Sequence, residues 1–130
     1  MTAQVITVTP ATTLAEFARI CTEDDISGAP VMQIGGDVVG MVTKTDLIER
    51  LIEDHPLYGG GETPTQAFAH DHRQVDEIMS EAVHRVSPDA PLADLAAMMA
   101  ENKIHRVLVM EESKLLGIVT SLDVLAQFAS

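Results

Sequence analysis

An internal duplication constrains the fold of this chain more than any other feature of its sequence. A shift of 78 residues aligns residues 5–10 with residues 83–88 and the first helical pattern with the second. After one residue is dropped in the second copy, the same glycine, threonine and aspartate close both copies: Gly40, Thr43, Asp46, Gly117, Thr120 and Asp123. Unrelated amphipathic segments can share the spacing of their apolar residues, but they do not also share Pro, Gly, Thr and Asp at matching positions. These shared residues therefore predict two copies of one structural unit.

Each copy has the pattern of a β-α-β-β-α unit. A short β segment ends at Pro10 or Pro88, since proline cannot donate a ladder hydrogen bond. A helix follows, with apolar side chains at i, i+3, i+4 and i+7: Leu14, Phe17, Ala18 and Cys21, then Leu92, Leu95, Ala96 and Met99. Two strands come next, at 29–34 and 38–42 or at 107–110 and 115–119, before a last helix. One unit of about 45 residues would be marginally stable alone. We therefore predict an α/β fold of two such repeats, packed about a pseudo-twofold axis with their sheets facing each other.

The repeats divide the chain into residues 1–53, a connector at 54–74, and residues 75–130. Two prolines and three consecutive glycines predict a long loop in the connector,. Either it is a mobile connector, or it is a lid or docking loop, because Tyr58 and Phe68 are apolar groups that solvent alone does not explain. Residues 75–79 are typical of a short helical lead-in to the second copy.

Composition narrows the class of partner. The chain has 130 residues, 46% of them hydrophobic, and a net charge of −12. That charge argues against nucleic acid and against an anionic membrane surface, because both are bound through Lys and Arg. No apolar run approaches the roughly 18 residues of a membrane span. The single cysteine, Cys21, cannot form an internal disulfide, which favours a cytoplasmic location.

The duplicated pattern resembles the cystathionine-β-synthase (CBS) domain, which occurs mostly as a tandem pair. The resemblance rests on Asp-Glu-Ile-Met-Ser at 76–80, Val-x-Pro before each first helix, Ile-Ser-Gly-Ala-Pro-Val at 26–31, and the duplicated closing motif, Gly-apolar-apolar-Thr-x-x-Asp. It covers nearly the whole chain outside the connector. It implies two clefts between the copies that bind adenine nucleotides or, less often, S-adenosylmethionine. It also implies a homodimer that regulates an attached or separate enzyme or transporter.

The Thr-x-x-Asp motif has both a structural and a functional interpretation. A threonine three residues before an acid, at the start of an apolar helix, is typical of a capping box that satisfies N–H groups of the first turn. A helix start directly after a strand also suits a phosphate, and a carboxylate one turn into the helix suits the two ribose hydroxyls. Capping and binding are not exclusive, so both interpretations stay open.

The resemblance implies that each cleft combines the Thr-x-x-Asp of one copy with the strand start of the other. One cleft is expected to hold Thr2, Ile26, Ser27, Gly28, Thr120 and Asp123. The other is expected to hold Thr43, Lys44, Asp46, Ser80, Ile104, His105 and Arg106. Backbone groups that flank Ile26 or Ile104 would then contact the adenine edge.

Charge distinguishes the two expected clefts. His105 and Arg106 resemble the His-Arg pair that holds phosphates in AMP-sensing members, and Lys44 adds a second cation, whereas Ser27 and Gly28 offer no charge. An acidic chain needs such a local group of cations to hold an anion. We therefore expect the Arg106 cleft to bind a phosphorylated ligand more tightly. AMP, ADP and ATP stay open as that ligand, with S-adenosylmethionine ranked behind them. The alternative for these two residues is a solvated histidine and a surface ion pair.

Two classes of function follow. The first is a regulatory module that senses adenine nucleotides and controls a partner or fused protein. The second is a ligand-free dimerisation or docking module whose Thr-x-x-Asp motifs only cap helices. An enzyme is not expected, because no nucleophile with an adjacent base stands out. A metal site is not expected either, because the histidines lack a helical pair or a cysteine partner. Cys21 lies on an apolar helix face and is expected to be inert.

Overall fold

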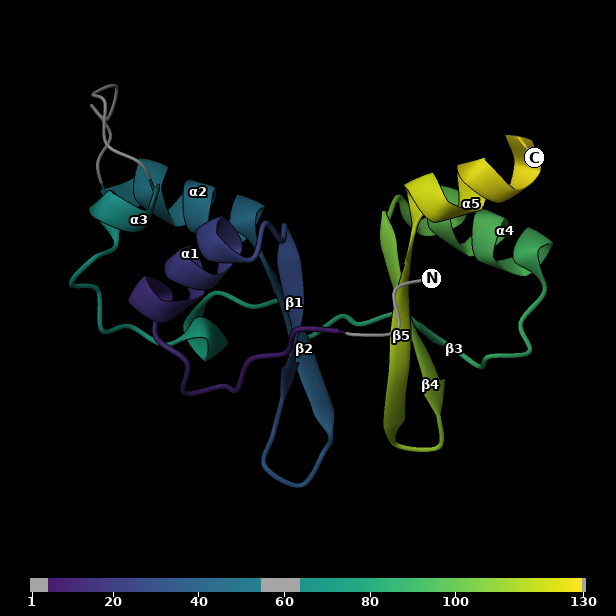
Figure 1. Ribbon diagram of the computed structural model, residues 1–130, viewed down its shortest axis with the longest axis horizontal. Coiled ribbons are helices and arrows are strands. Elements are labelled where there is room, and N and C mark those ends of the chain that lie inside the picture. Colours follow the sequence, from purple (N-terminus) through teal and green to yellow (C-terminus); the bar gives the residue numbers. More distant parts are fainter. Residues whose placement is uncertain (1–4, 55–63, 130) are drawn as a thin grey trace. The chain divides into compact units, whose positions relative to one another are not determined.

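The computed structural model describes residues 5–54 and 64–129 (Figure 1). Its helices and strands are α1 (Leu14–Glu23), β1 (Gly28–Met32), β2 (Val38–Thr43), α2 (Lys44–Asp54), α3 (Pro64–Ala67), a 3-10 helix (Val75–Glu77), β3 (Arg85–Val86), α4 (Leu92–Asn102), β4 (Arg106–Glu111), β5 (Lys114–Thr120) and α5 (Ser121–Ala129). This is the expected order except that α3 was not predicted and the segment before Pro10 forms no strand. They form two compact units. The first unit comprises residues 6–82, and the second comprises residues 83–129 together with Val5.

The first unit is built on an antiparallel hairpin of β1 and β2, which pairs Gly28 with Thr43. The hairpin turn contains Gly35 and Gly36, whose φ angles of +114° and +101° favour glycine,. Helices α1 and α2 pack on one face of the hairpin through an apolar core: Val8, Leu14, Phe17, Ala18, Cys21, Ala29, Val31, Val42, Leu47, Leu51, Phe68 and Val75. The first predicted β segment contributes only a single parallel bridge, from Val8 to Val31.

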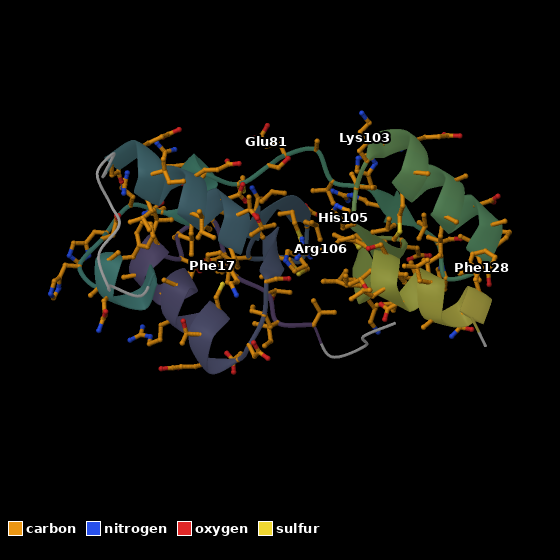
Figure 2. The ribbon with its side chains drawn as sticks, turned by 90° about the horizontal axis from the view of Figure 1, so that it is seen from above. Phe17, Glu81, Lys103, His105, Arg106 and Phe128 are labelled. Atoms are coloured by element: carbon orange, nitrogen blue, oxygen red, sulfur yellow. The ribbon has the colours of Figure 1, made fainter. Side chains whose placement is uncertain are left out.

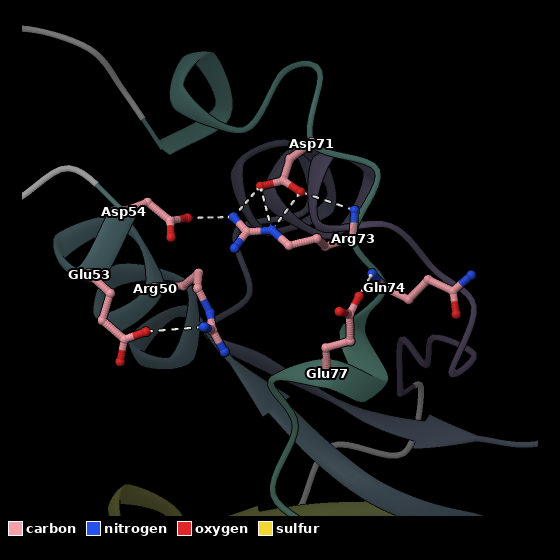
Figure 3. Close-up of polar contacts among 7 residues, drawn as sticks. All are labelled: Arg50, Glu53, Asp54, Asp71, Arg73, Gln74 and Glu77. Atoms are coloured by element: carbon pink, nitrogen blue, oxygen red, sulfur yellow. Dashed lines mark hydrogen bonds and ion pairs between the residues drawn. The ribbon is translucent and has the colours of Figure 1, made fainter.

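Residues 64–74 belong to this unit and its core, which differs from the long loop that the sequence predicts at 54–74. Residues 64–67 are helical, and the Phe68 side chain is only 2% exposed. The carbonyl of Arg73 accepts a hydrogen bond from the Leu14 N–H at 2.8 Å, so this segment satisfies part of the α1 N-terminus,. Figure 3 shows the Arg73 guanidinium bonded to the carboxylates of Asp71 and Asp54, which ties the segment to the end of α2. The segment packs on the first unit because burial of the Phe68 ring is favourable, and a buried ring holds the backbone on either side of it close to the core. Tyr58 lies outside the described residues.

The helical lead-in predicted at 75–79 forms a 3-10 helix at Val75–Glu77, and together with Ser80 it belongs to the first unit. Ser80 and Met41 exchange two backbone hydrogen bonds, each 2.9 Å long. Gly40 makes this approach feasible, because a Cβ there would lie 2.6 Å from the Met79 sulfur and 2.8 Å from the Ser80 carbonyl oxygen. The lead-in therefore borders β2 close to Thr43.

The second unit repeats this architecture. Strands β3, β4 and β5 form one sheet, parallel between β3 and β4 and antiparallel between β4 and β5. Helices α4 and α5 lie together beside it (Figure 1). The core contains Leu95, Met99, Val107, Val109, Val119 and Val124.

Local details confirm that the two units are copies. The parallel pairing of Val8 with Val31 recurs as Val86 with Val109 at the same 78-residue shift. Each first helix ends before a left-handed residue, Asp25 with φ of 51° or Lys103 with φ of 54°,. The predicted α/β fold of two related repeats is confirmed.

Candidate functional site

The first Thr-x-x-Asp motif forms a complete capping box where β2 meets α2. The N–H of Thr43 donates to Oδ2 of Asp46 at 2.8 Å, and the N–H of Asp46 donates to Oγ1 of Thr43 at 3.2 Å. The Thr43 hydroxyl also donates to the same carboxylate oxygen at 3.1 Å. The structural interpretation of the motif is therefore confirmed in this repeat.

The second motif repeats this geometry where β5 meets α5. The N–H of Thr120 donates to Oδ2 of Asp123 at 2.9 Å, and the N–H of Asp123 donates to Oγ1 of Thr120 at 3.2 Å. Both aspartates are half-buried. In each repeat the strand-to-helix junction is thus held rigid by side chains as well as by the ladder.

The strand start of the same repeat completes each junction. The N–H of Lys44 donates to the Ser27 carbonyl at 2.8 Å, and the N–H of Ser121 donates to the His105 carbonyl at 2.9 Å. Across the hairpins, Gly28 pairs with Thr43 and Arg106 pairs with Thr120. We call these groups the first corner (Ser27, Gly28, Thr43, Lys44, Asp46) and the second corner (His105, Arg106, Thr120, Asp123).

The paired residues of each corner lie on the sheet face opposite the helices. Side chains alternate along a strand, and Val107 and Val119 point into the core beneath α4 and α5. Their neighbours Arg106 and Thr120 therefore point to the other face. The same alternation in the first unit places Thr43 opposite the face on which Val42 is buried.

Capping leaves part of each carboxylate available. The hydrogen bonds that the Asp46 and Asp123 carboxylates accept from Thr43 and Thr120 all end on Oδ2. A carboxylate offers about four acceptor positions on its two oxygens. Oδ1 can therefore accept a ligand hydroxyl while Oδ2 maintains the cap.

The backbone N–H groups at the starts of α2 and α5 offer fewer free hydrogen-bond donors to a ligand than the carboxylates offer acceptors. Those of Thr43, Lys44 and Asp46 are already bonded within the first corner, and those of Thr120, Ser121 and Asp123 within the second. A phosphate at either corner therefore depends mainly on cationic side chains.

The two corners differ in the number and direction of their cationic side chains. In the second corner His105 is exposed and Arg106 is half-buried, two and three residues after Lys103, which follows the last residue of α4 (Figure 2). In the first corner the only cation is Lys44, and its side chain lines a pocket between α1 and α2 instead of the face on which Thr43 lies. Burial raises the pKa of the Cys21 thiol to about 11, and the nearby Lys44 ammonium opposes this rise,. The structure thus keeps Lys44 on the helix side of the sheet.

The remaining predicted site residues fall into the same two groups. Ser80 lies beside the first corner through its bridge to Met41. The N–H groups of Ile26 and Ile104 themselves donate to the carbonyls of Cys21 and Met99. The expected contact between the flanking backbone groups and an adenine edge stays a prediction. Thr2 lies outside the described residues. Within the second unit, Arg106 lies opposite Thr120 in the capping box of Asp123. The predicted grouping of Arg106 with Thr43 and Asp46 joins residues of both units and stays a prediction.

Sequence reasoning missed one surface. Among the described residues, the last helix of each repeat exposes large apolar side chains: Ile48 and Ile52 on α2, and Leu122, Leu125 and Phe128 on α5. The available signal was that both helices carry more apolar residues than one buried face can use.

Two further observations concern the part of the chain that the structure describes. No group of three or more His, Cys, Asp or Glu side chains there is arranged to hold a metal ion. None of the helices there is long and apolar enough to span a membrane.

Comparison with known sequences agrees with this architecture. The sequence profile of the CBS domain matches residues 1–53 and 75–130. The CBS domain-containing protein YhcV of Bacillus subtilis is 30% identical over 92% of this chain and 75% of its own length. An uncharacterized protein of Methanocaldococcus jannaschii is 30% identical over 99% of this chain, which spans about a third of that relative (31%).

Solved structures show the same fold. A Methanocaldococcus jannaschii protein, described as a candidate archaeal homolog of γ-AMPK, is 28% identical with a TM-score of 0.78, over 98% of this chain and 45% of its own. A CBS domain pair solved in complex with 5′-methylthioadenosine and S-adenosyl-L-methionine has a TM-score of 0.77 at 24% identity, over 98% of this chain and 93% of its own. The profile matches account for both repeats and leave out only the connector, so this chain belongs to the CBS domain family and carries a CBS domain pair, a regulatory module.

Proposed function

We propose that this chain senses an adenine nucleotide, that the second corner is its tighter site, and that occupancy controls a partner or fused protein. The observation that carries the proposal is the register of β4 and β5, which sets Arg106 directly opposite Thr120 in the capping box of Asp123. The junction between β5 and α5 would then supply both a cation for the phosphate, Arg106, and a carboxylate for the ribose, Asp123.

The roles follow from the chemistry of each group. Arg106 would hold the phosphate through a charge-assisted, bidentate contact, with His105 beside it. Oδ1 of Asp123 would accept from the ribose hydroxyls while Oδ2 keeps the cap. The first corner has the same carboxylate in Asp46 but no cation on its sheet face, so we expect it to favour an uncharged adenosyl compound or to bind more weakly.

The solved relatives support an adenosyl ligand. The fold of one of them accommodates methylthioadenosine and S-adenosylmethionine, and another is described in relation to γ-AMPK. AMP, ADP and ATP come first for this chain because its second corner carries the cations, and S-adenosylmethionine comes behind them.

Thermal unfolding with AMP, ADP, ATP and S-adenosylmethionine tests the proposal. A ligand present at 100 times its dissociation constant stabilises the folded state by about 2.7 kcal/mol, which raises the melting temperature by roughly 10 °C for a chain of this size. The matched pair of variants is Arg106→Gln, which should remove most of the shift, and Arg85→Gln on the neighbouring strand β3, which should keep it. If no compound shifts the transition at millimolar concentration, the Thr-x-x-Asp motifs act as caps only and the chain is a docking module.

We further propose that the chain forms a homodimer. The exposed apolar side chains of α2 and α5 support this, since contiguous apolar patches on soluble proteins mark interaction sites,. Sedimentation velocity at micromolar concentration should show a species of twice 14.0 kDa, and a single 14 kDa species would refute it.

A further inference from the structure

A pocket lies on the helix side of the first unit, away from the sheet face on which Thr43 lies. It has a volume of about 280 Å³ and opens between α1 and α2, which lie side by side (Figure 1). Its lining comes from α1, from the turn after α1 and from the first residues of α2: Ala18, Cys21, Thr22, Asp25, Lys44, Leu47 and Ile48. We call it the α1–α2 pocket.

The floor of the α1–α2 pocket is apolar. Ala18, Cys21 and Leu47 are only 1%, 5% and 2% exposed. The Thr22 hydroxyl donates to the Ala18 carbonyl at 3.1 Å, so it already has a partner. Pockets for drug-sized ligands have volumes of roughly 300–1,000 Å³. This pocket therefore suits a smaller molecule with a short apolar part.

Two exposed side chains of opposite charge, Lys44 and Asp25, line the same pocket. Among the described residues, neither of them forms an ion pair or a side-chain hydrogen bond with another. Burial raises the pKa of the Cys21 thiol and the Lys44 ammonium opposes this rise, so the charge of Lys44 acts on the floor of the pocket. Within the described part of the chain, the pocket thus offers a cation and an anion that are not paired with each other.

These two charges discriminate among classes of ligand. A ligand whose only charge is a carboxylate would contact Lys44 but would be repelled by Asp25, and a ligand whose only charge is an ammonium group would be repelled by Lys44. A zwitterion meets an opposite charge at both ends, and hydrogen bonds between charged groups are the strong ones. A free α-amino acid carries both groups on one carbon, and a short apolar side chain would be buried on the floor.

We propose that the α1–α2 pocket binds a free apolar α-amino acid of the size of valine, leucine, isoleucine or methionine. Lys44 holds its carboxylate, Asp25 holds its ammonium group, and its side chain packs on Ala18, Cys21 and Leu47. This inference goes beyond nucleotide sensing and does not depend on it, because it uses the helix side of the hairpin. The chain would then respond to two classes of metabolite, one at each side of its sheet.

Titration calorimetry of the full chain with three related compounds tests the charge pattern. The compounds are L-leucine, 4-methylpentanoate, which is leucine without its ammonium group, and 3-methylbutylamine, which is leucine without its carboxylate. Each of the last two lacks one charged contact, so it should bind roughly ten- to a hundredfold more weakly than leucine.

Two variants and two matched controls assign the contacts to residues. Lys44→Gln and Asp25→Asn should each weaken leucine binding roughly ten- to a hundredfold, and asparagine tolerates the φ of +51° at position 25,. The controls are Lys114→Gln and Asp24→Asn, which remove the same charges outside the pocket lining and should leave leucine binding unchanged.

Alkylation of Cys21 by N-ethylmaleimide locates the bound amino acid. Cys21 is the single cysteine of the chain and lines the pocket, so saturating leucine should slow its alkylation. Leucine binding with unchanged alkylation would overturn the proposal.

Three other results would overturn it as well. They are no binding of any of the four amino acids at millimolar concentration, 4-methylpentanoate binding as tightly as leucine, and equal effects of Asp24→Asn and Asp25→Asn. Thermal shifts with nucleotides report on the corners separately. A normal nucleotide shift without leucine binding therefore refutes the amino-acid site alone, and leucine binding without a nucleotide shift refutes nucleotide sensing alone.

Discussion

Replacing Phe68 with alanine should destabilise the first unit severely, although this residue lies in a segment that resembles a loop. Its ring is 2% exposed and packs in the same cluster as Leu14, Phe17 and Val75. Truncating a buried phenylalanine costs about 3–5 kcal/mol, the lost transfer energy plus that of the remaining cavity. That is a large part of the roughly 5–15 kcal/mol by which domains are stable.

Urea unfolding followed by circular dichroism measures this effect. With a typical slope of about 2 kcal/mol per molar, the midpoint should fall by roughly 2 M at unchanged slope. Ile34→Ala is the control, because Ile34 is equally apolar but fully exposed, and its effect should stay within about 0.5 kcal/mol. If Phe68→Ala moves the midpoint no further than Ile34→Ala does, residues 64–77 are not part of the core.

Three further variants test other parts of the fold. Gly40→Ala should lower the free energy of unfolding by about 2–4 kcal/mol, because the new methyl group collides with Met79 and the Ser80 carbonyl,. It should also speed amide hydrogen exchange at Met41 and Ser80, and unchanged exchange there would contradict the backbone bridge between them. Asp71→Asn should lower the free energy of unfolding by about 1 kcal/mol at neutral pH, which a lower urea midpoint would show. Arg73 lowers the pKa of Asp71, so the stabilisation by this ion pair is complete above the unfolded-state pKa of about 4 and is lost as pH falls through the lower folded-state pKa. A difference between variant and wild type that does not shrink as pH is lowered from about 4 would refute the ion pair. The Cys21 pKa of about 11 exceeds the unfolded value of 9.0, so the unfolding free energy should fall between pH 9 and 11 in the wild type and not in Cys21→Ala.

The sequence predicted those parts of the fold that show as regularly spaced apolar residues or as turn and capping residues at fixed positions. The duplication, the first and last helix of each repeat, and both hairpins follow from apolar spacing and from Pro, Gly and Thr-x-x-Asp. The capping boxes at Thr43 and Thr120 follow from the same motif, because capping is a local interaction between residues three apart. These elements needed no information about tertiary contacts.

The parts that the sequence did not predict depend on contacts between distant residues. Phe68 gives no periodic signal, and only the assembled core shows that it packs against α1. The grouping of Arg106 with Thr120 depends on the register of β4 and β5, which a strand pattern alone does not specify. The direction of the Lys44 side chain depends on the pocket that α1 and α2 form around it.

Titration calorimetry of AMP into three variants tests the central claim, that the second corner holds a phosphorylated adenosyl ligand, most directly. Arg106→Ala should weaken binding roughly ten- to a hundredfold, the loss of a charged hydrogen bond. Asp123→Asn keeps an oxygen for the cap but loses a ribose acceptor, so it should weaken binding about tenfold. Asp46→Asn, the matching change in the first corner, should leave the tighter site intact. If Asp123→Asn binds AMP as tightly as the wild type or more tightly, Asp123 only caps α5, since removing a negative charge near phosphate would then help, and the account is wrong.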